Sequence, residues 1–185
     1  MPSKVVTMPR DLSRRELFGF WRKGEREPEK PARPPPRIWL RPPGADSEDV
    51  FADTCQRCGK CIEICPRECI FPLEADGTPA IIARRAPCVL CDGILCTTVC
   101  PSGALQRLER REEVHMGLAV VIQRTCVTWH GQPCDVCHTA CPVPGALRLE
   151  WAQPIVDGDK CTGCGLCEFS CPTAPASIVV RPRQP

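Results

Sequence analysis

The sequence comprises 185 residues, of which 17 are cysteine, and carries a formal net charge of +2. This length limits the chain to one or two small domains, and no stretch approaches the roughly 18–20 apolar residues that a membrane-spanning helix requires. A secreted, disulfide-stabilised domain is the ordinary class for so much cysteine. The odd count, the tight clustering and the absence of an evident signal peptide speak against that class.

Positive charge is concentrated in the N-terminal part of the chain. Residues 1–43 hold 11 Lys/Arg against 5 Asp/Glu, a net of +6, and the other residues hold 13 against 17, a net of −4. The sequence therefore predicts a basic arm over residues 1–43 and a mildly acidic body over residues 44–183.

The arm contains an arginine pair, Arg14-Arg15, of the kind found in twin-arginine export signals. Such a signal also needs an apolar segment behind the pair, whereas a charged, proline-containing stretch follows here from Gly24 to Pro31. We therefore expect a cytoplasmic protein, and the arginine pair keeps a periplasmic location open. The apolar residues between Leu17 and Trp21 predict either an amphipathic segment that docks on a partner or an unfolded basic tail.

The end of the arm is rich in proline, including the run Pro34-Pro35-Pro36. This composition favours an extended, stiff spacer without internal hydrogen bonds. The first element of the body is expected to be a short helix from Glu48 to Thr54.

Four cysteine-rich repeats make up the body, with first cysteines at positions 55, 88, 126 and 161. The first and fourth follow the pattern C-x2-C-x2-C-x3-C-P, which bacterial ferredoxins use to hold [4Fe–4S] clusters. The second and third have variant gaps of x4 and x7 but also end in x3-C-P. A single C-x2-C would suit zinc or a redox pair, but four such quartets indicate iron–sulfur chemistry.

The quartets predict four [4Fe–4S] clusters. Their sixteen predicted ligands are Cys55, Cys58, Cys61, Cys65, Cys88, Cys91, Cys96, Cys100, Cys126, Cys134, Cys137, Cys141, Cys161, Cys164, Cys167 and Cys171. Cys69 is left over, and we interpret it as a small buried thiol that is not a ligand. With so few aromatic residues (5 %), bound clusters are expected to supply much of the folding free energy.

Each repeat is expected to fold as a turn, a short helix and a strand, because the proline after the last cysteine fixes φ and ends the helix. Apolar pairs or triplets after each Cys-Pro are the predicted strands, and Asp76-Gly77 and Asp157-Gly158 are predicted turns. Gly59, Gly163 and Gly165 suit tight turns whose amides point at cluster sulfurs. The predicted fold class is α+β: two bacterial ferredoxin-like (dicluster) modules with short helices and small antiparallel hairpins, preceded by an extended N-terminal arm. The predicted strands lie at Ile70-Phe71, Ala104-Leu105, Ala146-Leu147 and Ile178-Val179-Val180.

The pairing of the repeats has two solutions. In two-cluster ferredoxins the fourth cysteine of one run ligates the other cluster. Pairing by regularity joins the first repeat with the fourth and the second with the third, so that Cys171 would complete the cluster of the first repeat and Cys65 that of the fourth. Sequential pairing, first with second and third with fourth, is the alternative. Both solutions use the same sixteen ligands.

Histidine can replace cysteine on iron, as in Rieske centres, and the sequence contains His115, His130 and His138. Every quartet is already complete, so we expect these histidines at the surface. His130, beside Trp129, is the candidate for a hydrogen-bond donor next to a cluster.

Several further segments of the sequence are distinctive: Arg41–Ala45, the Cys-x2-Cys-Gly-Lys-Cys start, Pro87–Cys91, Val99–Leu105, Met116–Val120, Cys134–Cys137 and Cys161–Gly165. Together they resemble the NapG/MauM ferredoxin-type family over roughly residues 40–180. The resemblance implies four [4Fe–4S] clusters and an association with electron supply to periplasmic nitrate reductase or with methylamine utilisation. The N-terminus departs from NapG-like proteins and is similar to NapF, a cytoplasmic ferredoxin-type relative linked to maturation of nitrate reductase.

No nucleotide-binding loop, nucleophile triad or carboxylate pair stands out, so we predict an electron carrier without its own substrate site. It would relay single electrons to or from a partner oxidoreductase. By resemblance, that partner is a membrane quinol-oxidising component or a molybdenum reductase, and no nucleic-acid partner is expected. The alternative is an accessory or maturation factor that binds a metalloenzyme through its basic arm.

Overall fold

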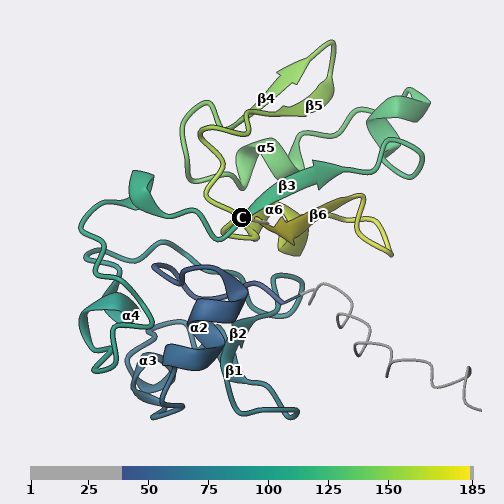
Figure 1. Cartoon of the computed structure of the whole chain (residues 1–185). Helices are drawn as coiled ribbons and strands as arrows, with labels where there is room; N and C mark the ends of the chain where they lie inside the picture. Colours follow the sequence, from purple (N-terminus) through teal and green to yellow (C-terminus); the bar gives the residue numbers. More distant parts are fainter. Residues whose placement is uncertain (1–38, 184–185) are drawn as a thin grey trace, which may run out of the picture. The chain divides into compact units, whose positions relative to one another are not determined.

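The computed structural model describes residues 39–183 (Figure 1). The predictions for the arginine pair, the aromatic segment after it and most of the proline-rich spacer fall outside these residues. The described residues belong to one compact unit. Leu40 and Arg41, which precede residue 44, are buried in it.

Short helices and two-stranded antiparallel sheets make up the described residues, which confirms the mixed class that the sequence predicts. The α-helices are α2 (Glu48–Thr54), α3 (Lys60–Glu63), α4 (Leu95–Thr98), α5 (Val136–Thr139) and α6 (Leu166–Ser170), and the 3-10 turns are η1 (Arg111–Glu113) and η2 (Val127–His130). The strands are β1 (Ile70–Pro72), β2 (Pro79–Ile81), β3 (Gly117–Val121), β4 (Leu147–Glu150), β5 (Gln153–Val156) and β6 (Ile178–Pro182).

Helix α2 has the bounds predicted from the sequence, and a buried arginine fixes it to the rest of the fold. Glu48 lies in its first turn, where a negative charge is favourable, and Phe51 is fully buried. The Arg41 guanidinium forms an ion pair with Glu48, donates to the Thr78 hydroxyl and the Pro79 carbonyl oxygen, and lies 4.9 Å from the Phe51 ring centroid. These contacts join α2 to the start of β2.

Two of the three sheets are local hairpins. Strands β1 and β2 pair across the Asp76-Gly77 turn, as predicted, with Ile70 opposite Ile81. Strands β4 and β5 also pair, but their turn is Trp151-Ala152, two non-glycine residues with φ of 53° and 66°. The predicted Asp157-Gly158 turn instead follows β5 and leads into Cys161.

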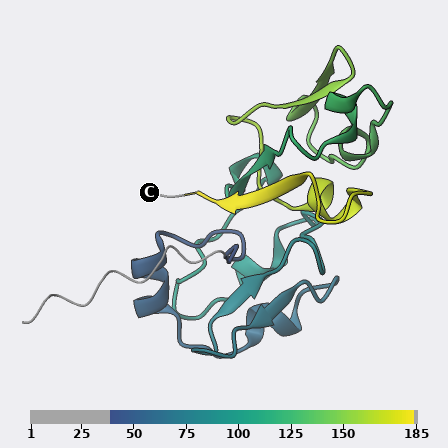
Figure 2. The same cartoon turned by 90° about the vertical axis from the view of Figure 1, so that its right-hand side faces the viewer.

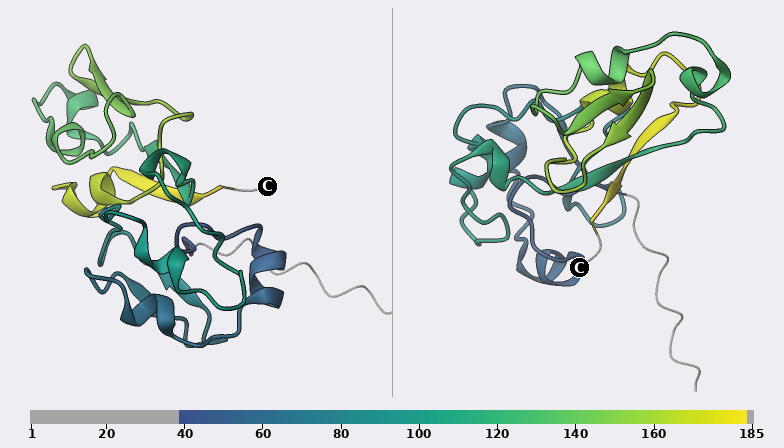
Figure 3. Two further views of the ribbon diagram at one scale, coloured as in Figure 1. Left: turned by 90° about the vertical axis from the view of Figure 1, so that its left-hand side faces the viewer. Right: turned by 90° about the horizontal axis from the view of Figure 1, so that it is seen from above.

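The third sheet joins segments that are distant in the sequence. Strand β3 pairs antiparallel with β6, with Gly117 opposite Pro182 and Val121 opposite Ile178; Figures 2 and 3 show β6 (yellow) crossing beside β3. The predicted strand at Ala104-Leu105 is absent from the described residues, where Leu105 forms a single bridge with Ala45. The C-terminal strand therefore pairs with the middle of the chain.

Two groups of buried side chains form the cores of what we call the first half (residues 39–115) and the second half (116–183). The first core contains Leu40, Phe51, Ile81 and Leu90 together with cysteines of the first two repeats. The second core is smaller and contains three cysteines of the fourth repeat beside Leu147 and Ile178, with two partly buried cysteines of the third repeat packed against it. Cysteine thus contributes a large share of both cores.

A glycine-on-alanine contact and a set of hydrogen bonds join the two halves. The Cys88 amide donates to the Cys164 carbonyl oxygen over 2.9 Å. A Cβ placed on Gly165 would lie 2.5 Å from the Cβ of Ala83, so only glycine allows this approach. The Arg84 guanidinium donates to four backbone carbonyl oxygens at and after the end of α6, on Glu168, Phe169, Cys171 and Thr173.

The cysteine loops need left-handed backbone at equivalent positions. Gly163 (φ 74°) precedes the second cysteine of its repeat, and Arg57 (φ 56°) and Leu90 (φ 51°) hold the same conformation at the corresponding positions. Glu68, at φ 49°, lies between Cys65 and Cys69. A non-glycine residue in this region costs roughly 1–2 kcal/mol.

Replacing the exposed Glu68 with glycine is therefore expected to stabilise the holoprotein by about 1 kcal/mol, because the strained φ is relieved. Denaturant titration followed by the visible absorbance of the bound clusters measures this. The matched control is Glu63→Gly in helix α3, which should destabilise by about 1 kcal/mol. If Glu68→Gly lost as much stability as Glu63→Gly, the positive φ of Glu68 would not be a source of strain.

Candidate iron–sulfur sites

The structure gathers the sixteen predicted ligand cysteines into four groups. Three of the groups each line a single cavity, and in the remaining one the Cys61 thiol feels the charges of Cys55, Cys58 and Cys100. Site 1 comprises Cys55, Cys58, Cys61 and Cys100; site 2 comprises Cys65, Cys88, Cys91 and Cys96; site 3 comprises Cys126, Cys134, Cys137 and Cys171; site 4 comprises Cys141, Cys161, Cys164 and Cys167.

This grouping is the sequential pairing, so the pairing by regularity is wrong. Cys65 lies with the cysteines of the second repeat, and Cys171 with those of the third. The reason is packing: helix α3 contacts α4, and α5 contacts α6. The β1–β2 hairpin reverses the chain between the first and second repeats, and the β4–β5 hairpin reverses it between the third and fourth. Each hairpin therefore lets consecutive repeats pack together. The set of candidate ligands is the same in both pairings.

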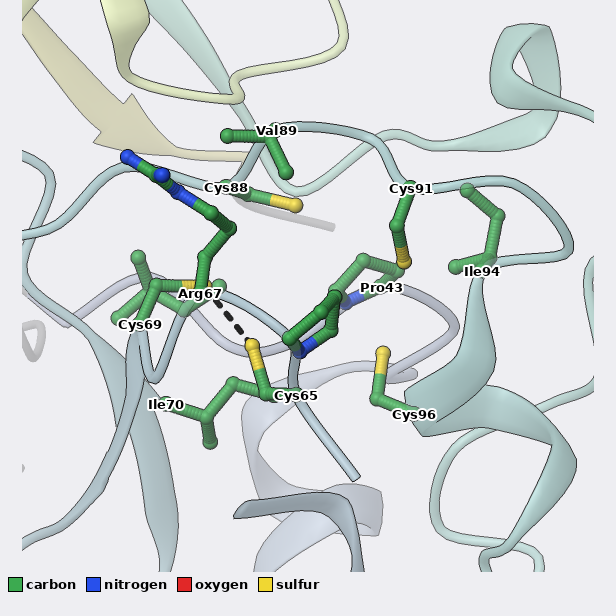
Figure 4. A pocket seen from close by; sticks show the side chains of 12 residues that line it. Pro43, Cys65, Arg67, Cys69, Ile70, Cys88, Val89, Cys91, Ile94 and Cys96 are labelled. Atoms are coloured by element: carbon green, nitrogen blue, oxygen red, sulfur yellow. Dashed lines mark hydrogen bonds between the residues drawn. The ribbon is translucent and has the colours of Figure 1, made fainter. Parts of the chain in front are cut away.

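Site 2 shows how the elements position the sulfurs. Cys88 and Cys91 lie in the loop before α4, Cys96 lies within α4, and Cys65 follows α3 from the preceding repeat. Figure 4 shows these four thiols around one cavity. Cys69 lines the same cavity, and its sulfur lies 3.4 Å from that of Cys65.

The donor set and its burial fit a cationic iron centre. Burial, and then the neighbouring thiols Cys88 and Cys91, raise the pKa of Cys96 to about 12. Burial, followed by Cys134 and Cys126, likewise raises the pKa of Cys137 to about 11. Several thiolates therefore cannot share these cavities unless a cation compensates their charge, and coordination to a metal deprotonates a thiol outright.

The spacing suits a group larger than one ion. Among residues 39–183, no set of three or more Cys, His, Asp or Glu side chains lies close enough together to hold a single metal ion. Three of the quartets instead surround shared cavities. At site 4 the hydroxyl of Thr162 lines such a cavity, buried without a hydrogen-bond partner of normal geometry. A sulfur-rich cluster would offer that hydroxyl an acceptor.

Hydroxyl groups two residues after a ligand cysteine are functional groups that our sequence reasoning missed. Ser102 contacts the thiol of Cys100 at 3.6 Å, and Thr173 contacts that of Cys171 at 3.2 Å. Burial alone would raise the pKa of Cys100, but the hydrogen bonds it accepts, first from the Leu105 amide and then from Ser102, lower it below its ordinary value. The Cys-Pro-Ser and Cys-Pro-Thr triplets are the sequence signal for these donors.

The histidines lie at the surface, as predicted. His130 does not have the expected role, because its Nε2 lies 2.9 Å from the Arg124 carbonyl oxygen. Thr128 takes that role, with its hydroxyl 3.2 Å from the Cys126 sulfur. The predicted tight turns at Gly59, Gly163 and Gly165 are confirmed by their positive φ angles.

Comparison with known proteins identifies the family. Residues 151–173, which include the whole fourth cysteine run, match the family described as a 4Fe-4S binding domain. The chain is 42% identical to the ferredoxin-type protein NapG of Escherichia coli, over 78% of this chain and 71% of that protein. The chain belongs to the NapG/MauM ferredoxin-type family.

Other relatives agree with this assignment. Identity is 39% to the methylamine utilization ferredoxin-type protein MauM of Methylorubrum extorquens, over 78% of this chain and 73% of that protein. The ferredoxin-type protein NapF of Escherichia coli is more distant, at 28% identity over 89% of this chain and 92% of that protein. In the part of the chain that the structure describes, none of the helices is long and apolar enough to span a bilayer.

Double substitutions test the grouping of the cysteines. Cys58→Ser and Cys100→Ser each remove a ligand of site 1, so each should cost about four iron atoms, and the double variant should lose no more than either single one. Iron analysis and EPR of the reduced protein measure this loss. The control pair, Cys58→Ser with Cys171→Ser, spans two sites and should lose about eight iron atoms. A loss of about eight iron atoms from the Cys58→Ser, Cys100→Ser variant and of about four from the control pair would show that the pairing by regularity is correct.

Proposed function

We propose that this member of the family is an electron relay of two dicluster modules that carries four [4Fe–4S] clusters, one at each of sites 1 to 4, and has no substrate site of its own. Each cluster, when bound, supplies a one-electron centre whose potential depends on hydrogen bonds and burial. The first half contributes sites 1 and 2, and the second half contributes sites 3 and 4.

Interactions between candidate ligand cysteines support the order 1–2–4–3. The charge of Cys61 in site 1 contributes to raising the pKa of the Cys96 thiol in site 2. The charge of Cys137 in site 3 likewise contributes to raising the pKa of the Cys167 thiol in site 4. Between the halves, the Cys88 amide of site 2 donates to the Cys164 carbonyl oxygen of site 4. This hydrogen bond between two ligand residues carries the proposal, because it links the two modules at their candidate ligands.

The burial of the cysteines matches this order. Three of the four cysteines at site 4 are buried, and two at site 2, whereas sites 1 and 3 have one each. Cys58 of site 1 is exposed to solvent. An inner pair of shielded sites with two more accessible ends suits a relay that takes up an electron at one end and releases it at the other.

The partners of such a relay are redox proteins. The names of the relatives and the family resemblance favour an oxidoreductase of the nitrate-reductase type or an amine-oxidising system. We propose that docking occurs at sites 1 and 3, since these are the accessible ends.

The junction between sites 2 and 4 offers the sharpest test. Ala83→Leu places a larger side chain against Gly165, and should break the hydrogen bond from Cys88 to Cys164 without touching a ligand. We expect about sixteen bound iron atoms, as in the wild type, and slower redistribution of electrons between the halves. Rapid-freeze EPR after addition of one equivalent of dithionite follows this redistribution.

The matched control is Ala75→Leu in the β1–β2 turn, where the side chain is exposed. It should leave both iron content and electron redistribution unchanged. Unaltered redistribution in the Ala83→Leu protein would show that electrons do not cross at this junction. A wild-type protein with about eight iron atoms would contradict the four-cluster proposal itself.

A further inference from the structure

Site 2 contains a fifth sulfur. Cys69 is 2% exposed, its Sγ lies 3.4 Å from the Sγ of Cys65, and it is also in hydrogen-bond contact with the thiol of Cys88. In Figure 4 the dashed line marks the contact with Cys65, at the edge of the cavity that the four ligand thiols surround. One buried thiol thus touches two candidate ligands of one site.

Two of the other repeats provide a hydrogen-bond donor beside their last cysteine. The last cysteines of the second and fourth repeats, Cys100 and Cys171, each contact a hydroxyl two residues later, on Ser102 and Thr173. Cys65 has Arg67 at the corresponding place, and that side chain offers no hydroxyl. The Cys69 thiol supplies the contact instead, from the start of the segment that leads into β1.

The direction of the hydrogen bond follows from the chemistry of the ligands. A cysteine that binds iron does so as a thiolate and holds no proton, so Cys69 is the donor toward its two neighbours, Cys65 and Cys88. Its single proton serves one sulfur at a time, and we take as acceptor Cys65, whose sulfur lies 3.4 Å away. Reduction adds negative charge to an iron–sulfur centre, and a donor to its ligand sulfur favours the reduced state.

We propose that Cys69 is a positioning residue of site 2, whose thiol donates a hydrogen bond to the Cys65 ligand sulfur and raises the reduction potential of the cluster bound there. This inference rests on the proposed four-cluster relay. Since site 2 lies between site 1 and the junction with site 4, Cys69 sets the driving force of the step from one module to the other.

The test compares Cys69→Ala with the wild type by potentiometric EPR titration and iron analysis. We expect unchanged iron content, one of four midpoint potentials shifted to a more negative value, and three potentials unaltered. The shifted cluster is assigned to site 2 through the signal that Cys96→Ser removes. Cys69→Ser keeps a donor group, an O–H on a shorter bond to Cβ, and should recover part of the shift.

A matched control comes from site 1. Ser102→Ala removes the corresponding hydroxyl donor and should shift the site 1 potential while leaving that of site 2 unaltered. As a second readout, pulsed EPR of the wild type in D₂O should detect an exchangeable proton coupled to the reduced site 2 cluster, and Cys69→Ala should remove it.

The outcomes separate the inference from the relay itself. Four unchanged midpoints in Cys69→Ala, with about sixteen iron atoms in both proteins, would overturn the role of Cys69 and leave the relay standing. Loss of about four iron atoms in Cys69→Ala would also overturn the donor role, because it would make Cys69 a ligand. Wild-type protein without a cluster at site 2 would overturn both.

Discussion

The gathering of four cysteine sulfurs, nearly all buried or partly buried, at each candidate site is the constraint on which this structure depends. Neutral thiols tolerate that environment, but the thiolates that bind iron do not unless a cation balances their charge. The free-energy cost of burying a thiolate is reflected in raised thiol pKa values, for which burial is the first cause at each position: Cys61, Cys96, Cys137 and Cys164. Cysteine also fills much of both cores. The fold and the bound metal are therefore expected to form together, as in other small metalloproteins.

The short elements follow from the same constraint. Three of the four cysteine loops hold the residue before their second cysteine in left-handed backbone, on Gly163 in the fourth repeat and on Arg57 and Leu90 in the first and second. Helices α3 to α6 end within about one turn because a Cys-Pro follows each of them soon after. Contacts at the junction then place two modules against each other through Gly165, Ala83 and the Arg84 guanidinium.

Cysteine spacing was sufficient to predict iron–sulfur chemistry and the candidate ligands, and the segment ahead of the first cysteine was sufficient to predict helix α2, because these depend on local sequence. It could not decide the pairing of repeats, since the regular gaps of the first and fourth runs say nothing about which helices pack together. The β4–β5 turn was missed because Trp151 and Ala152 adopt positive φ without a glycine to signal it. The pairing of β3 with β6 was missed for a different reason: strands far apart in the sequence share no local pattern. Thr128 and Ser102 were not predicted as donors, because only the folded loops bring their hydroxyls to the sulfurs of Cys126 and Cys100.

We propose that four clusters lie in the order 1–2–4–3, each held by three cysteines of one repeat and one of its sequential neighbour. Anomalous diffraction at the iron edge from crystals of the holoprotein tests this most directly. We predict four iron clusters, with that of Cys88, Cys91 and Cys96 completed by Cys65 and adjacent to the cluster of site 4 across the junction. A cluster held by the first repeat and completed by Cys171 would contradict the claim.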